Sequence, residues 1–392
     1  MVFLDALDQL SDADHGQNMG WLPARLPEHV RLVVSTLPGK CLTALEQRFA
    51  GEASSLPVNE SQEGMHAPPF LEVTPMNAQE GAELLAVWLY EARRTLQPRQ
   101  RDEVLTKFLG CPYPLYLKLV FEEARRWRSW DQTAGVMGDV AGVLSNLFVR
   151  LEQPRQHEAL LVSRALGYLA ASRYGLTEDE LLDVLSADKE VMANFRSRSP
   201  KSPTLERLRV VVWARLLADI EPYMTQRQTE GATALTFYHR QVAEAARDKY
   251  LSGDNELRTH HQLAEFFHAQ DYFLESVEEQ RARAKRLPET PRPANARKVT
   301  ELPWQRLEAA KLSGDWDAVE TLFTSLVFLE AKAEAAMAFD LATDFAQAVA
   351  VYPTQRSPCQ VLHLLEKAIR RDLHFIFRYP TTLFQCLWNN CW

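Results

Sequence analysis

The stretches Val2–Leu10 (VFLDALDQL) and Val30–Thr36 (VRLVVST), near the start of the chain, decide its fold. Each begins as a short apolar run and ends in polar residues. Runs of this kind are typical of strands that are buried on both faces, as in a parallel sheet. A third run, Phe70–Val73, predicts another short strand. Residues 1–75 are therefore predicted to hold part of a parallel α/β sheet.

The sequence pattern becomes helical after residue 75. Asn77, with Glu80 three residues later, is typical of a capping box, in which each side chain bonds the backbone of the other residue at a helix start. Amphipathic stretches follow, and Gly110-Cys111-Pro112 separates two of them. Residues 76–152 are therefore predicted to form a helical lid subdomain.

Two short runs further along the chain predict a β-hairpin among helices. They are Pro222–Thr225 and Ala234–Tyr238. Helices followed by a hairpin and a final helix predict a winged helix in residues 153–252. Residues 253–392 are almost entirely helical in pattern but have no fixed period, so we expect an α-helical arm that is only repeat-like. The predicted fold class is mainly α with an α/β remnant.

The composition argues against several classes of partner. The chain carries a net charge of -8 at pH 7, whereas nucleic-acid-binding domains are usually basic. No stretch reaches the roughly 18 to 20 apolar residues that a membrane span needs. The five cysteines form no Cys-x-x-Cys pair, which fits reduced thiols in a cytoplasm. We therefore expect a cytoplasmic protein with no nucleic-acid partner and no membrane span.

Acidic and hydroxyl side chains follow the first two predicted strands. A P-loop ATPase places a carboxylate at this edge of its sheet, where Mg²⁺ lies beside the nucleotide phosphates. Asp5 is the candidate metal ligand, and Asp8 is the candidate catalytic residue that orients water. The hydroxyls of Ser35 and Thr36 are candidates for binding phosphate. The structural alternative is that Asp8 caps a helix while Ser35 and Thr36 only begin the following Pro-Gly turn.

These segments carry a family resemblance. LDALDQL, followed by WLPARLPEHVRLVVSTLPG, resembles the Walker B and sensor 1 segments of NACHT-type STAND ATPases, among them bacterial WD-repeat-bearing proteins and the nephrocystin and telomerase-associated groups. The resemblance implies a partial P-loop sheet. In the family a glycine usually follows the first acid, whereas Ala6 stands here, and Gln9 rather than an acid follows Asp8. These departures put hydrolysis in doubt.

Two further elements match the family. Gly110–Leu119 resembles its Gly-x-Pro element, which implies that Pro114, or alternatively Pro112, contacts bound ADP while the following leucines pack over the base. Thr236–Arg240 resembles the Phe-x-His element of the winged helix, which implies that His239 binds the β-phosphate of ADP. The structural alternatives are an ordinary helix start at the proline and a helix cap at the histidine.

The phosphate-binding loop itself has no counterpart in this chain. The motif G-x-x-x-x-G-K-[ST] occurs nowhere, because Gly39-Lys40 is followed by Cys41 and has no glycine five residues before it. We expect the P-loop upstream of Met1 and a WD-repeat domain after Trp392, so that the chain is the C-terminal part of such an ATPase. Alone, it should bind ATP, ADP and Mg²⁺ weakly and should not hydrolyse ATP.

The resemblance implies a two-state switch. ADP would hold a closed state, and exchange for ATP would release the winged helix and permit self-association. A first alternative is a non-catalytic scaffold that binds a protein partner. A second is a winged-helix DNA-binding protein, which the acidic balance disfavours. The basic stretches Arg93-Arg94 and Arg125–Arg128 (RRWR) could stack on bases, or could form a solvated helix face near Glu122-Glu123.

Overall fold

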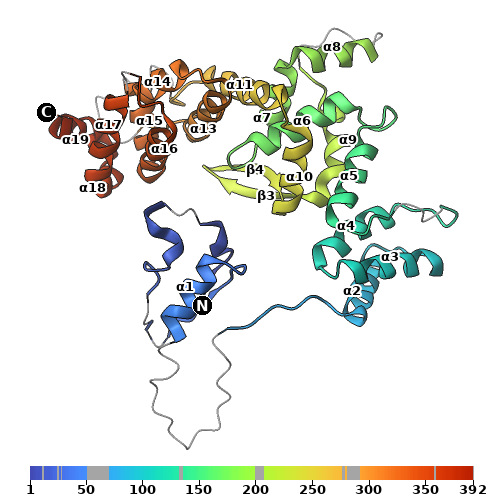
Figure 1. The fold of residues 1–392 in the computed structure, drawn as a ribbon. Coiled ribbons are helices and arrows are strands. Elements are labelled where there is room, and N and C mark those ends of the chain that lie inside the picture. Colours follow the sequence, from blue (N-terminus) through green and yellow to red (C-terminus); the bar gives the residue numbers. More distant parts are fainter. Residues whose placement is uncertain are drawn as a thin grey trace, which may run out of the picture. The chain divides into compact units, whose positions relative to one another are not determined.

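The computed structural model describes residues 1–10, 13–23, 26–27, 29–50, 70–131, 136–198, 207–275, 279, 292–356 and 359–391. These residues form two compact units, Met1–Val73 and Thr74–Trp392, which are considered one at a time. Figure 1 labels their helices and strands. The chain is mainly helical with few strands, as predicted.

The first unit contains a small parallel sheet. Its elements are β1 (Val2–Leu4), η1 (Leu7–Gln9), η2 (Ala13–Asn18), β2 (Leu32–Val34) and α1 (Lys40–Ala50). β1 and β2 pair in parallel, with Val2 opposite Leu32 and Leu4 opposite Val34. The predicted parallel arrangement of these two runs is confirmed.

Two other expectations for this unit are wrong. Leu4, Leu32 and Val34 pack against a small core of Leu7, Met19, Leu22, Cys41 and Leu45. Side chains alternate along a strand, so the other face carries Phe3, which is 68% exposed, and the sheet is buried on one face only. Phe70–Val73 forms no strand, and its side chains are exposed. No described strand offers that segment a pairing partner.

The second unit begins with four helices in the region predicted to form the lid subdomain. They are α2 (Ala78–Glu91), α3 (Pro98–Gly110), α4 (Pro114–Ala124) and α5 (Val140–Leu151). The predicted capping box is present, because the Glu80 amide donates to Asn77 at 2.9 Å and the Asn77 amide donates to Glu80 at 2.8 Å. Gly81 lets Phe108 pack directly on the α2 backbone, since an added Cβ would lie 2.2 Å from the ring.

A winged helix follows the lid. Its elements are α6 (Ala159–Ala171), α7 (Glu178–Ala187), α8 (Lys189–Arg198), α9 (Val210–Ile220), η3 (Glu221–Tyr223), β3 (Met224–Thr229), β4 (Ala232–Phe237) and α10 (Arg240–Tyr250). β3 and β4 form the predicted antiparallel hairpin, but the first strand starts at Met224 rather than Pro222 and continues through residues 226–229, which were expected to be loop. Glu230 and Gly231 turn it with φ of 47° and 77°, as a two-residue hairpin turn requires. A bridge from Leu176 to Leu235 joins the loop after α6 to the hairpin.

The rest of the unit is the helical arm. It comprises α11 (Asp254–His268), α13 (Ala296–Ser313), α14 (Asp317–Phe323), α15 (Leu326–Glu334), α16 (Ala338–Val351), α17 (Cys359–Arg371), α18 (Leu373–Arg378), η4 (Pro380–Thr382) and α19 (Leu383–Cys391). Leu302, Phe323, Phe328 and Phe345 are among its fully buried core residues. Gly314, with φ of 75°, ends α13 in the left-handed conformation that favours glycine.

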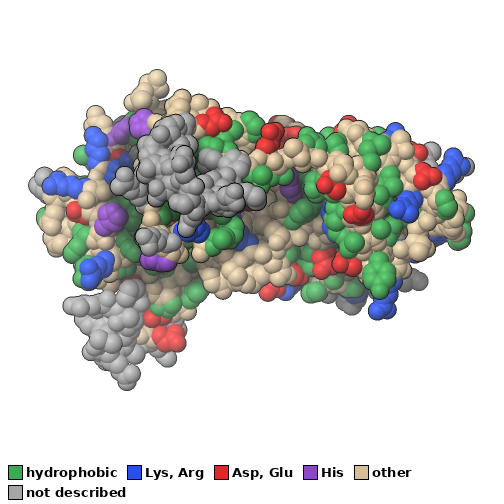
Figure 2. Space-filling model, turned by 90° about the horizontal axis from the view of Figure 1, so that it is seen from below, with side chains coloured by type: hydrophobic (Ala, Val, Ile, Leu, Met, Phe, Trp, Pro, Cys, Tyr) green, Lys and Arg blue, Asp and Glu red, His purple; other side chains and the backbone are tan. Residues whose placement is uncertain are grey.

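The surface mixes charge with apolar groups. Acidic and basic side chains lie among hydrophobic ones across the face seen in Figure 2. None of the described helices combines the length and the apolar character that a membrane span requires.

Candidate functional site

The ends of β1 and β2 bring Asp5 and Ser35 together. The Ser35 hydroxyl donates to Asp5 Oδ1 and accepts a hydrogen bond from the Ala6 amide at 2.9 Å. Backbone bonds fix this pairing, because the Ser35 amide donates to the Leu4 carbonyl at 3.0 Å and the Leu7 amide donates to the Ser35 carbonyl at 2.9 Å. Both side chains are exposed. The two polar residues therefore meet at the carboxyl edge of the sheet.

Asp8 joins the same edge, whereas Thr36 turns toward its own backbone. Asp8 Oδ1 accepts a hydrogen bond from the Leu37 amide at 3.2 Å, so it ties the turn after β1 to the turn after β2. The Thr36 hydroxyl donates to the Leu37 carbonyl at 3.1 Å. Asp5, Asp8 and Ser35 thus form one polar group on two adjacent loops.

Ala6 occupies a conformation that suits glycine. Its φ of 58° and ψ of 52° place it in the left-handed helical region. For a residue with a Cβ this region costs about 1–2 kcal/mol. The family resemblance has glycine at this position, and the geometry gives a physical reason for it. This chain keeps the turn but accepts the strain.

Pro114 begins α4 and is exposed. The chain before it is fixed, because the Pro112 carbonyl accepts a hydrogen bond from the Met76 amide at 3.0 Å. Leu117 and Leu119, which follow the proline, are fully buried in the lid core. These two are therefore not available to pack over a nucleotide base, whereas Leu115, directly after the proline, is only half-buried. Pro114 and the preceding Tyr113, which is 54% exposed, are accessible parts of this element.

His239 caps α10, as the structural alternative held. Its Nδ1 accepts a hydrogen bond from the Gln241 amide at 3.2 Å. A neutral ring bonded in this way carries its proton on Nε2, which leaves one ring N–H to donate. Burial lowers the pKa of His239 below its usual value and the adjacent Arg240 lowers it further, while Glu244 opposes the change. The ring is thus favoured in its neutral form.

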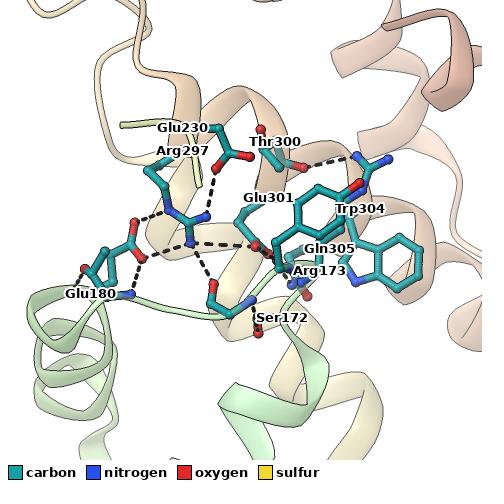
Figure 3. A network of polar contacts seen from close by, with 12 residues as sticks. Ser172, Arg173, Glu180, Glu230, Arg297, Thr300, Glu301, Trp304 and Gln305 are labelled. Atoms are coloured by element: carbon teal, nitrogen blue, oxygen red, sulfur yellow. Dashed lines mark hydrogen bonds and ion pairs between the residues drawn. The ribbon is translucent and has the colours of Figure 1, made fainter. Parts of the chain in front are cut away.

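A buried polar network, not foreseen from sequence, joins the winged helix to the arm (Figure 3). Arg297 of α13 bonds both carboxylate oxygens of Glu180 at 2.9 and 3.0 Å. It also bonds Glu230 in the hairpin turn at 3.0 Å and the Gly175 carbonyl at 2.8 Å. Burial by itself would lower the pKa of Arg297, but the bonds to these carboxylates and the nearby Glu301 outweigh it and raise the pKa.

Glu301, one turn further along α13, holds the loop after α6. It is fully buried and accepts hydrogen bonds from the amides of Arg173 at 3.1 Å and Tyr174 at 3.3 Å. Burial raises the pKa of Glu301, while Arg297 and the amide donors oppose that rise. The indole of Trp304 and the amide of Gln305 both donate to the Ala171 carbonyl at 3.1 Å. The C-terminal end of α6 is thus bonded directly to α13.

A second set of charges extends the network to α15 and α16. Arg173 pairs with Asp344 at 2.7 Å, and Asp344 also pairs with Lys332. Lys332 is fully buried and donates to the Val299 carbonyl at 2.9 Å. Two cations therefore share one carboxylate away from solvent. We call the set Arg173, Glu180, Glu230, Arg297, Glu301, Lys332 and Asp344 the junction network.

Only part of this network had a signal in the sequence. Glu180 was identifiable because it stands three residues after Thr177, at the position that completes a capping box. Arg297 and Glu301 are spaced four apart, as on one helix face, but that spacing is typical of exposed helices as well. Asp344 and Arg173 are 171 residues apart, and nothing local in the sequence connects them.

Comparison with known proteins identifies a matching family model and several relatives of this chain. Residues 133–258 match the model of the NWD1-like winged helix-turn-helix domain. The chain is 35% identical over 270 residues to the human NACHT domain- and WD repeat-containing protein 1. The matched region covers 68% of this chain and 16% of that protein. It is 33% identical over 325 residues to the mouse counterpart, covering 80% of this chain and 20% of that protein.

A third relative is the mouse NACHT and WD repeat domain-containing protein 2, with 32% identity over 276 residues, 70% of this chain and 15% of that protein. The chain thus spans about a fifth or less of the length of these relatives. No solved structure matches. These relatives are mammalian. The bacterial source that the resemblance in the sequence suggests stays a prediction, and so does the cytoplasmic location. The winged helix, the hairpin and the relatives agree with the resemblance in the sequence: the chain belongs to the NACHT family and carries its NWD1-like winged helix.

Proposed function

We propose that this chain is part of a nucleotide-controlled NACHT switch, in which ADP or ATP sets the position of the winged helix and thereby of the arm. The observation that carries the proposal is the pairing of Asp5 with Ser35 at the carboxyl edge of a parallel strand pair, with Asp8 beside them. That edge is where α/β proteins bind nucleotides.

The side chains at this edge suit a magnesium nucleotide. Asp5, Asp8 and Ser35 offer oxygen atoms, and Mg²⁺ prefers oxygen ligands while keeping several of its waters. In the proposal Asp5 holds the metal, Asp8 orients water, and the hydroxyl of Ser35 faces the phosphates; the hydroxyl of Thr36 joins it by leaving the Leu37 carbonyl. When bound, the metal would neutralise phosphate charge.

Hydrolysis by this chain alone is not expected. The sequence contains no G-x-x-x-x-G-K-[ST] motif, so the backbone cradle and the lysine that bind the β- and γ-phosphates are missing from it. Titration of the purified chain with ATP and Mg²⁺ should therefore give weak binding and no turnover. Micromolar affinity with Mg²⁺-dependent turnover would contradict this part of the proposal.

The closed state would depend on two residues of the second unit. Pro114 is exposed at the first turn of α4, and His239 has one ring N–H available from Nε2. In the proposal the two contact bound ADP, and the histidine donates to its β-phosphate. A ligand shifts such an equilibrium only by its different affinities for the two states. Loss of the histidine contact should therefore favour the open, self-associating state.

The test is a His239→Ala variant of the full-length protein. We expect less ADP to remain after purification and a larger self-associated fraction by light scattering. His261→Ala is the matched control, because His261 is also an exposed histidine of the second unit. If both ADP retention and the oligomeric state were unchanged, the proposed switch role of His239 would be wrong.

A non-catalytic scaffold is the second candidate. It is favoured by the junction network, which fixes the arm to the winged helix and so presents a rigid surface to a protein partner. An Asp5→Asn variant of the full-length protein separates the two, since it should impair a nucleotide switch and leave a scaffold intact. DNA binding has little support, because α9 exposes aliphatic side chains such as Val210 (58%) and Val211 (60%).

A further inference from the structure

One end of the lid collects arginines and exposed aromatic rings. We call Tyr90, Arg93, Arg94, Arg99, Arg101, Arg128 and Trp130 the arginine–aromatic surface. All seven side chains are exposed. They come from the end of α2, the start of α3 and the turn after α4. None of them takes part in the strand edge or the junction network.

Hydrogen bonds hold the three segments together. The Arg94 guanidinium donates to the Trp127 carbonyl at 2.7 Å, which ties the end of α2 to the turn after α4. The buried Gln100 donates to the Arg128 carbonyl at 2.9 Å and to the Asp131 carbonyl at 3.3 Å, which ties the start of α3 to the same turn. Side chains far apart in the sequence therefore share one continuous surface.

The two acidic residues expected from sequence to balance the arginines of this surface pair with other cations. Glu122 pairs with Lys118 and Arg125, and Glu123 pairs with Arg150. Within the described part of the chain, no ion pair engages Arg93, Arg99, Arg101 or Arg128. The balance expected from Glu122 therefore holds for Arg125, but it does not extend to these four arginines, whose positive charge is available to a partner.

The aromatic rings are as unusual as the charge. Tyr90 is 84% exposed and Trp130 is 73% exposed. The Arg128 guanidinium lies 5.7 Å from the centre of the Trp130 ring, in a cation–π contact. Tyrosine, tryptophan and arginine are the residues most enriched at the energetic centres of protein interfaces. This surface combines all three.

We propose that the arginine–aromatic surface binds an acidic segment of a protein partner, with carboxylates on the arginines and apolar side chains on Tyr90 and Trp130. The surface contains five arginines, and residues 90–101 and 125–131 contain no lysine. A guanidinium binds a carboxylate through two parallel hydrogen bonds, whereas a lysine offers only a point charge. A nucleic acid fits less well, because the chain as a whole carries a charge of -8.

The experiment uses the whole chain and a fluorescein-labelled, Glu-rich peptide that also contains phenylalanines. We expect saturable binding by fluorescence anisotropy that weakens with added salt. The triple variant Arg93→Glu, Arg99→Glu and Arg101→Glu should bind at least about tenfold more weakly. The double variant Tyr90→Ala and Trp130→Ala should also lose affinity, and all these side chains are exposed, so folding should be unaffected.

The matched control makes the same charge change elsewhere on the second unit, at Arg209, Arg215 and Arg378, which are also exposed. It should retain binding within about twofold, because long-range charge contributes little beyond the screening distance. An equal loss in the control would overturn the proposal. So would an absence of saturable binding, or tighter binding of a labelled single-stranded oligonucleotide than of the peptide.

Discussion

The strand edge and the junction network use the same chemical groups in opposite surroundings. At the edge, Asp5 and Ser35 are exposed and meet each other at the ends of two short strands. At the junction, Lys332 and Glu301 are fully buried; Lys332 pairs with Asp344 of the next helix, and Glu301 accepts from the Arg173 amide in the distant loop after α6. Exposed ion pairs contribute little to stability, whereas a buried charge that loses its partner is costly. Polar residues at the edge thus contribute little to stability, whereas those at the junction hold the fold.

Breaking the junction should have the largest effect. Asp344→Ala would leave Lys332 and Arg173 without their shared carboxylate in a buried place. The expected loss is about 3–5 kcal/mol in the free energy of unfolding, measured by urea denaturation. Asp317→Ala is the control, because Asp317 pairs with Arg356 where their side chains are 75% and 36% exposed. That change should cost less than about 1 kcal/mol, and equal losses would refute the contrast.

Two glycines of the winged helix provide a second comparison between a tightly packed position and an open one. An added Cβ at Gly175 would lie 2.3 Å from the Leu235 carbonyl oxygen, whereas one at Gly231 would meet nothing within 4 Å. Both have positive φ, 93° and 77°, so both alanine variants share the backbone strain. We expect Gly175→Ala to unfold at lower urea and to cost about 1–3 kcal/mol more than Gly231→Ala. Similar midpoints for the two would show that the α6 loop is not held tightly.

The contact between α11 and α13, beside the junction network, should weaken in acid. His260 bonds Gln305 at 2.6 Å, and burial holds its pKa below the usual 6.5, an effect that the Gln305 bond opposes. Below about pH 6.5 the unfolded chain therefore binds a proton that the folded chain does not, and stability falls as the pH is lowered. His260→Gln should remove part of this slope in thermal melts from pH 7 downward. The neighbouring His261→Gln should leave it unchanged, and an unchanged slope in both variants would exclude His260.

The smallest expected effect lies at the strand edge and has the opposite sign. Ala6 has φ of 58°, so Ala6→Gly should stabilise the first unit by about 1 kcal/mol. Ala44→Gly, within α1, should destabilise it by about 1 kcal/mol. Amide exchange of β1 reports both changes. Destabilisation by both glycines would show that Ala6 is not strained.

Local patterns predicted the local structure. The capping box at Asn77, the parallel pairing of β1 and β2 and the hairpin before His239 all follow from residues close in sequence. The pairing of Asp5 with Ser35 was inferable too, because the carboxyl ends of neighbouring parallel strands meet. The domain limits at 75, 152 and 252 and the nucleotide roles of Asp8, Thr36, Pro114 and His239 stay predictions.

Tertiary partnerships were not predictable in this way. In the sequence Arg297 resembles any charged residue on a helix surface. Its partner Glu180 lies 117 residues away and contacts it only in the folded chain. The apolar pattern of Phe3 likewise suggests burial, but no described element covers its face of the sheet. Apolar periodicity states which residues could be buried, and the available neighbours decide which of them are.

The central claim is that the junction network makes the winged helix and the arm one cooperative unit, which the strand edge does not share. Native-state amide hydrogen exchange tests it most directly in wild type and in Asp344→Ala. The probes are the amides of Leu235, bonded to Leu176 in the winged helix, Val299 in the arm, and Ser35 at the strand edge. We expect Leu235 and Val299 to lose protection equally while Ser35 is unchanged. Loss at Val299 with full protection at Leu235 would contradict the claim.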